Sequence, residues 1–159
     1  MNIFTIVLAI VTAVIAAFVL YVRLASNDPA VWDVDPLTVA KPTKSNHFLL
    51  RSDGGDTAGK VYETTPQDLL AAFDAVALAA PRTTILAGSV SSGQITYVTR
   101  SALWGFPDFT TVKAVQDGHG ARLVIFARSR FGESDLGVNR TRTQDWLSKL
   151  RLTDTTVGN

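Results

Sequence analysis

The densest group of residues that could do chemistry lies near the end of the chain, between positions 128 and 142. It combines four arginines with a serine, an aspartate and an asparagine: Arg128, Arg130, Ser134, Asp135, Asn139, Arg140 and Arg142. Guanidinium groups and the free amides of a helix N-terminus both bind anions. The segment therefore predicts a site for a small anionic ligand or a lipid headgroup, or else an internal staple in which these groups pair and cap the backbone. The staple is favoured, because ion-pair networks are commonly structural.

A second group of candidate residues forms the loop Trp104-Gly105-Phe106-Pro107-Asp108. Trp104, Phe106 and Asp108 are a candidate interface, since aromatic anchors dominate protein interfaces. The alternative is that the two aromatic rings cover an open end of the core. In that case Asp108 would pair with an arginine such as Arg100.

The sequence contains few of the residue patterns that a catalytic mechanism requires. It has no cysteine, which excludes thiolate metal sites, iron–sulfur clusters and cysteine nucleophiles. Its two histidines, His47 and His119, are isolated from each other and from any Ser/Asp pattern. We therefore predict no catalytic residues, no metal and no cofactor, and a protein that is not an enzyme. The net charge of +1 argues against a nucleic-acid partner.

The elements around these groups must position them, and the first is an apolar run at the N-terminus. Residues 3–22 include no charged side chain, and a helix of that length spans roughly 30 Å, the thickness of a bilayer's hydrocarbon core. We expect a retained single-pass transmembrane helix, with the lipid bilayer as partner. A cleaved signal has a shorter apolar region of about 7–15 residues, and a buried core helix seldom stays uncharged on every side.

Two signals for membrane topology point in opposite directions. Arg23 follows the apolar run and favours a cytoplasmic domain, because positive residues prefer that side. The very short tail before the run is instead typical of a signal-anchor that exports the rest of the chain. We expect the bacterial inner membrane, and the periplasmic side in preference to the cytoplasmic one.

Residues 23–64 are expected to form an extended spacer. Proline disfavours helix at and just before its own position, and it occurs here at Pro29, Pro36 and Pro42. Short apolar pieces at 47–50 and 60–62 would add edge strands. At the other end of the chain, residues 153–159 are expected to be a polar tail.

The patterned region, 65–152, predicts an α+β domain. Thr65 and Pro66 are typical of a helix start, and Pro81 would end that helix. Apolar stretches then predict strands at 83–87, 94–101, 109–116 and 121–130, and a closing helix at about 140–150 with Asn139 as its N-cap. This order favours an antiparallel sheet of about four strands, with both helices on one face.

The stretch FARSRFGESDLGVNRTRTQDW, at 126–146, resembles the signature of the family called domain of unknown function 1499. The similarity extends upstream through PRTTILAG, YVTRSALWGFPDFTTVKA and SNHFLL, and so covers nearly all of the chain outside the apolar run. The resemblance implies membrane helices in front of the domain but no established activity, cofactor or substrate. Some relatives carry a cysteine motif at the start of the domain, and this cysteine-free chain cannot share a thiol role.

These features together favour a membrane-anchored, non-catalytic interaction domain. We expect an accessory subunit of a larger complex of the bacterial inner membrane, for instance a respiratory complex, with integral-membrane proteins as partners. The alternative is a binder of a small anionic ligand or a lipid headgroup through residues 128–142.

Overall fold

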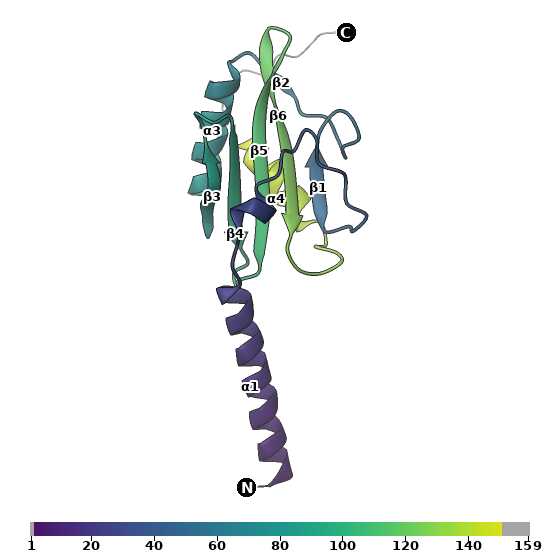
Figure 1. Ribbon diagram of the computed structural model, residues 1–159, viewed down its shortest axis with the longest axis vertical. Helices are drawn as coiled ribbons and strands as arrows, with labels where there is room; N and C mark the ends of the chain where they lie inside the picture. Colours follow the sequence, from purple (N-terminus) through teal and green to yellow (C-terminus); the bar gives the residue numbers. More distant parts are fainter. Residues whose placement is uncertain (1, 151–159) are drawn as a thin grey trace.

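The computed structural model describes residues 2–150, so the predicted polar tail at 153–159 lies outside the described residues. The elements follow one another as α1 (Ile3–Leu24), α2 (Pro29–Trp32), β1 (His47–Leu50), β2 (Val61–Tyr62), α3 (Pro66–Ala79), β3 (Thr83–Ser89), β4 (Gln94–Arg100), β5 (Pro107–Asp117), β6 (Gly120–Ser129) and α4 (Val138–Ser148). Figure 1 shows α1 projecting from one end of the domain, with the N-terminus at its free end.

The strands form one antiparallel sheet in the order β1-β6-β5-β4-β3, and β2 also pairs with β6. The predicted α+β class with an antiparallel sheet is confirmed, but the sheet has six strands rather than about four. The difference arises at the outer edge of β6. This long strand pairs with β1 along one part of its length and with β2 along another, so both short apolar pieces find a partner there.

The first helix of the domain, α3, begins and ends where its sequence predicts. The Thr65 hydroxyl accepts a hydrogen bond from the Asp68 amide at 3.1 Å, and Pro66 occupies the first turn, where its missing N–H costs nothing. The helix ends at Ala79, two residues before Pro81. Its apolar face is buried against the sheet.

The start of the last helix corrects one prediction. Asn139 does not cap α4, which begins at Val138 after Gly137 in the left-handed conformation, with φ of 82°. Asn139 lies inside the first turn and is fully buried. The left-handed glycine sets the start earlier than the polar side chain suggested, because glycine adopts this conformation without steric cost.

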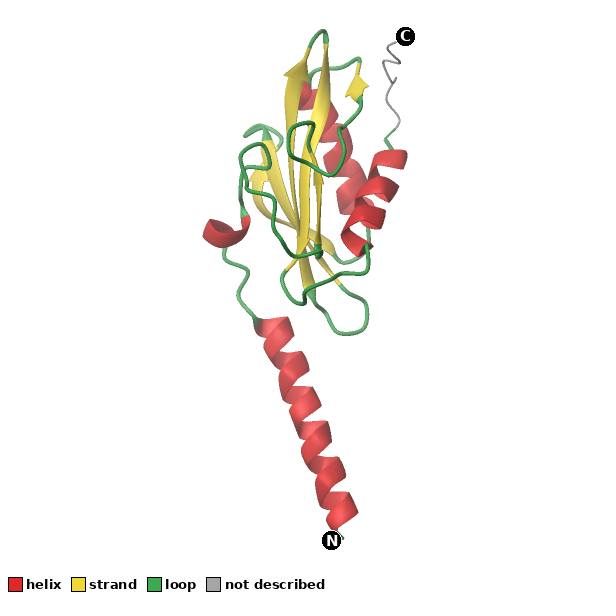
Figure 2. Cartoon of the chain, turned by 90° about the vertical axis from the view of Figure 1, so that its right-hand side faces the viewer, coloured by secondary structure: helices red, strands yellow, loops and turns green. Residues whose placement is uncertain are grey.

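One face of the sheet is covered by α3 and α4, and Figure 2 shows both helices on the same side of the strands. Three aromatic rings meet between these layers. The ring centroids of Phe73 and Trp146 are 5.8 Å apart, and those of Tyr97 and Trp146 are 6.1 Å apart. The Tyr97 hydroxyl donates to Asp74 at 2.8 Å. This layer holds the main hydrophobic core of the domain.

The opposite face of the sheet is covered by residues 26–39, which we call the strap. Figure 2 shows the short helix α2 on the side of the sheet away from α3 and α4. Trp32 at the end of α2 stacks on Phe109 of β5, with ring centroids 4.0 Å apart and planes 12° apart. Asp33 accepts hydrogen bonds from Gln94 at 2.8 Å and Thr96 at 2.6 Å. This part of the expected spacer is therefore bound to the sheet.

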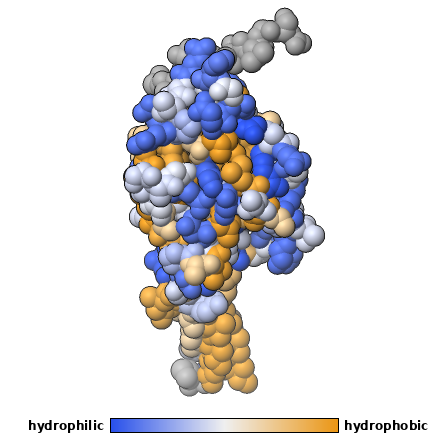
Figure 3. All heavy atoms as spheres, turned by 45° about the horizontal axis from the view of Figure 1, so that its top comes forward, coloured by the Kyte–Doolittle hydropathy of each residue, from blue (hydrophilic) through white to orange (hydrophobic). Residues whose placement is uncertain are grey.

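The N-terminal helix α1 stands apart from the core. None of the residues in its most apolar window is buried, and Figure 3 shows hydrophobic atoms covering the helix where it leaves the mixed surface of the domain. This exposure excludes the core-helix alternative. Among the described residues α1 is the one helix long and apolar enough to cross a membrane, a property that signal sequences share.

Candidate functional site

Two arginines of the predicted cluster, Arg128 and Arg130, come from the end of β6 and its following residue, and they bind the strap. Arg128 is buried and donates through Nη1 to Thr111 Oγ1 at 3.1 Å and to the Phe126 carbonyl at 3.0 Å, and through Nη2 to the Trp32 carbonyl. Its guanidinium also lies 4.5 Å from the Phe126 ring centroid. Burial lowers the pKa of Arg128 to about 10, against the opposing attraction of Asp33.

Arg130 extends the same contact toward the N-terminal helix α1. It donates to the Ser26 carbonyl at 2.6 Å and to Asn27 Oδ1 at 3.2 Å. Ser26 and Asn27 lie in the segment between α1 and α2, so Arg130 holds the beginning of the strap. Arg128 and Arg130 both donate to oxygen atoms of the chain itself: backbone carbonyls, the Thr111 hydroxyl and the Asn27 side-chain amide.

The other two arginines, Arg140 and Arg142, belong to α4 and lie on the opposite face of the sheet. The guanidinium of Arg140 is 4.4 Å from the Phe48 ring centroid, a cation–π contact. Arg142 forms an ion pair with Asp108 at 3.1 Å and donates to Asn139 Oδ1 at 2.5 Å. The four arginines are therefore divided between two faces of the sheet and do not converge on one ligand.

The remaining polar residues of the cluster close the loop between β6 and α4. Asp135 accepts from the Gly137 amide at 3.0 Å and the Asn139 amide at 2.8 Å, which satisfies free donors at the start of the helix. Ser134 accepts from the Leu136 amide at 3.2 Å. The buried Asn139 amide group donates to the Asn46 carbonyl at 3.2 Å and to Ser129 Oγ at 3.0 Å. These contacts tie α4 to the edge of the sheet.

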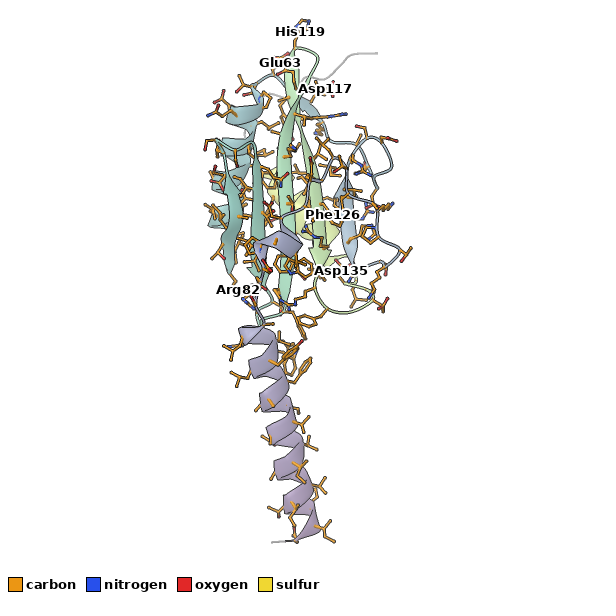
Figure 4. All side chains as sticks on the ribbon, in the orientation of Figure 1. Glu63, Arg82, Asp117, His119, Phe126 and Asp135 are labelled. Atoms are coloured by element: carbon orange, nitrogen blue, oxygen red, sulfur yellow. The ribbon has the colours of Figure 1, made fainter. Side chains whose placement is uncertain are left out.

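A cavity of about 850 Å³ lies between α3 and α4. The Asp108–Arg142 pair lies in its wall. The other charged residues that line it are Arg82, Arg100, Asp145 and Lys149, and the apolar lining includes Val76, Ala79, Leu136, Val138 and Trp146. Figure 4 shows the labelled Arg82 at the end of the domain next to α1, whereas Glu63, Asp117 and His119 lie at the opposite end.

Leu136 is the most unusual residue of this cavity. Its side chain is 94% exposed, and its backbone has a φ of 55°, which is strained for a leucine. The neighbouring Val138 is also exposed. A large apolar side chain held in water on a strained backbone contributes nothing to the core, and such features gather at functional sites.

The candidate interface residues Trp104 and Phe106 contact the apolar helix α1. Phe106 lies 6.1 Å from Phe18 of α1 between ring centroids, and Arg23 donates to the Leu103 carbonyl at 3.5 Å. Asp108 lies apart from them, because β5 carries it to the cavity side. The structure therefore divides this predicted group into a pair of residues beside α1 and a cavity residue.

The structure places the two histidines in unrelated positions. His47 lies at the start of β1, where its Nδ1 is 2.6 Å from the Lys44 carbonyl. His119 lies in the tight turn between β5 and β6, at the end of the domain far from α1 (Figure 4). Within residues 2–150, no group of three or more side chains is arranged to hold a metal ion.

Sequence reasoning missed three residues of the cavity wall, Arg82, Arg100 and Leu136. They come from the start of β3, the end of β4 and the loop before α4, so no local spacing connects them. One signal was present in the sequence. Leu136 interrupts a polar loop between Asp135 and Gly137, a position where a large apolar side chain has no core to enter.

A family model described as a protein of unknown function (DUF1499) matches residues 32–150, about three quarters of the chain. No curated protein and no solved structure was found to match. The resemblance seen in residues 126–146 is thus confirmed. The matched region begins at Trp32, the strap residue that stacks on Phe109.

Proposed function

This chain belongs to the DUF1499 family, and we propose that it is a membrane-anchored, non-catalytic interaction domain. In this proposal it is an accessory subunit of a larger protein complex of the bacterial inner membrane, for instance a respiratory complex, and integral-membrane proteins are its partners. In this proposal the domain lies on the periplasmic side of that membrane.

The anchor is supported by how α1 joins the domain. Its last turns contact the loop that contains Trp104 and Phe106, and Val22 is 1% exposed there. A signal sequence removed by cleavage would leave these aromatic residues uncovered. A retained helix holds the domain against the membrane surface and limits its partners to those within reach of that surface.

The single observation that carries the interaction proposal is the exposed, strained Leu136 beside the cavity between α3 and α4. The cavity is open and its wall is largely apolar, and Leu136 and Val138 extend this apolar surface outward. An apolar side chain of a partner protein suits such a surface better than a polar substrate does. The charged groups of the wall are positioned to orient the partner.

The experiment is purification of the full chain from native membranes in a mild detergent, followed by native mass spectrometry. We expect a complex of fixed stoichiometry that is lost in the Leu136→Asp variant. The matched control is His119→Asp, an exposed position at the opposite end of the domain, which should keep the partner. Recovery of the unmodified chain as a monomer without a partner would contradict the proposal.

A second candidate function is the binding of a small anion, and one observation favours the cavity as its location. Four basic residues line it against two acidic ones, a formal excess of two positive charges: Arg82, Arg100, Arg142 and Lys149 against Asp108 and Asp145. Titration with inorganic phosphate tests this candidate. We expect weaker binding in the Arg82→Gln variant, because Arg82 is exposed and the substitution removes one positive charge from the cavity wall.

A further inference from the structure

The loop between β4 and β5, residues 101–106, has an unusual surface for a loop of a water-soluble domain. Leu103 is 72% exposed and Trp104 is 42% exposed. The loop lies beside α1, where Trp104 and Phe106 form one wall of a hollow of about 340 Å³. The other wall consists of Val14, Ile15 and Phe18, so the residues around this hollow are all apolar.

We propose that this loop enters the surface layer of the bilayer beside α1 and forms a second membrane attachment of the domain. Its ligand is the lipid itself: acyl chains surround Leu103 and Trp104 and fill the hollow against α1. The proposal rests on α1 spanning the membrane and is independent of any protein partner.

The length of α1 determines the depth of the loop. The helix has 22 residues, a length of about 33 Å, which is only slightly more than the roughly 30 Å of the hydrocarbon core. The helix therefore has almost no freedom to slide out of the membrane. The residues that face the loop, from Val14 to Phe18, lie four to eight positions before Val22, or roughly 6–12 Å inside the end of the span. The loop residues that contact them therefore lie at a similar depth in the bilayer.

The backbone at the base of the loop is suited to this environment, because several of its polar groups are bonded within the chain. The Ser101 amide donates to the Phe106 carbonyl at 2.9 Å, the Gly105 amide to the Ser101 carbonyl at 3.2 Å, and the Phe106 amide to Ser101 Oγ at 3.0 Å. Each of these bonded groups would otherwise cost several kcal/mol if it were placed in lipid.

Two arginines bond further carbonyls of the loop at the boundary. Arg100 donates to the Gly105 carbonyl at 2.9 Å, and Arg23 reaches the Leu103 carbonyl at 3.5 Å. Long basic side chains can hold their charged ends at the level of the headgroups while their stems lie along apolar surface. Tryptophan is likewise enriched at membrane–water boundaries. The chemistry of the loop thus changes from charged to apolar toward its tip.

The absence of cysteine allows a direct test with single nitroxide labels. The full chain is reconstituted in vesicles of phosphatidylcholine and phosphatidylglycerol with Leu103→Cys, and accessibility is measured to oxygen, which concentrates in lipid, and to a nickel chelate, which stays in water. The exposed His119→Cys at the far end of the domain is the aqueous reference. Ile10→Cys, within α1, is the lipid reference.

We expect the oxygen-to-nickel ratio at Leu103→Cys to be several times that at His119→Cys and to approach that at Ile10→Cys. A ratio equal to that at His119→Cys, with a high ratio at Ile10→Cys, overturns the proposal while leaving the anchor intact. Low ratios at both Leu103→Cys and Ile10→Cys overturn the anchor as well.

A second measurement needs no label. In vesicles with brominated acyl chains, which quench nearby tryptophans, we expect Trp104 to supply most of the quenchable fluorescence, because Trp146 is buried in the core and Trp32 is covered by the strap contacts. The Trp104→Phe variant should therefore lose that component. Equal quenching of the two proteins would count against the loop's insertion.

Discussion

At the scale of single residues, Leu136 combines strain with exposure, and the two can be separated by substitution. A leucine in the left-handed conformation costs about 1 kcal/mol relative to glycine, and its 94% exposed side chain adds no burial. We therefore expect Leu136→Gly to raise the free energy of unfolding by about 0.5–1 kcal/mol. Urea denaturation in detergent measures this change. A clear loss of stability would show that Leu136 is structural.

Arg128 is the opposite case, a residue whose contacts are entirely internal. Arg128→Lys keeps the charge but loses the guanidinium group, which donates hydrogen bonds to Thr111, the Phe126 carbonyl and the Trp32 carbonyl. We expect the variant to lose about 2–4 kcal/mol of stability, because a buried ammonium cannot satisfy these acceptors. The matched control is Arg130→Lys at the partly exposed neighbouring site. Similar urea midpoints for the two variants would contradict this account of Arg128.

The chemistry of the arginines could be predicted only in part, and the reason is the distance along the chain. Alternation in β6 correctly predicts that Arg128 and Arg130 share a face. Their partners in the strap are carbonyl groups about a hundred residues earlier. Because every residue has a backbone carbonyl, no residue type in the sequence identifies the one that is bound. The division of the four arginines between two faces follows from that unpredicted packing.

At the scale of elements, the strap is held to the sheet partly by charge, which makes its attachment depend on pH. Burial raises the pKa of Asp35, but the hydrogen bonds from Lys113 and the Leu37 amide and the charge of Lys113 together outweigh burial and leave it lowered from 3.8. A lowered pKa in the folded state stabilises the fold above about pH 4, and this contribution disappears as the pH falls through the folded-state pKa.

The Asp35→Asn variant measures that contribution. The Lys113 and Asp35 side chains are 30% and 35% exposed, so solvent screening limits the ion pair to about 0.5 kcal/mol. We expect the variant to be less stable than the native chain by this amount at pH 7, and the two unfolding free energies to converge below about pH 3. A difference that persists at pH 2.5 would assign the effect to something other than the charge.

Elements with a local signal were predicted well, and those without one were not. The cap at Thr65 and the stop at Pro81 delimit α3, and the residues Gly118 and His119 form the expected tight turn between β5 and β6. The strap has no periodic pattern, because a single stacked ring, Trp32 on Phe109, and a few carboxylates hold it. Contacts of this kind depend on which distant strand the strap packs against, and that strand cannot be identified from the sequence alone.

At the scale of the whole molecule, the contacts between α1 and the domain bear on whether the N-terminal helix is kept in the mature protein. Cleavage after the small residues Ala25 or Ser26 would separate α1 from the strap. The Ser26 carbonyl is bound by Arg130, and Arg23 is packed against Gly105 in the β4–β5 loop. A protease needs an extended, accessible segment, and these contacts hold the segment against the domain.

We therefore expect the mature protein in native membranes to have the mass of the full chain, apart from processing of the first methionine, when intact protein is measured by mass spectrometry. The Arg130→Gln variant releases the Ser26 carbonyl and should increase any cleaved fraction, whereas Arg122→Gln, on the same strand face but bound to Ser52 and Asp117, should not. A measured mass that corresponds to a chain beginning after residue 24, 25 or 26 would show that α1 is a cleaved signal. The proposed insertion of the loop at 101–106 would then lose its basis as well, because its depth and its apolar hollow both depend on α1 spanning the membrane.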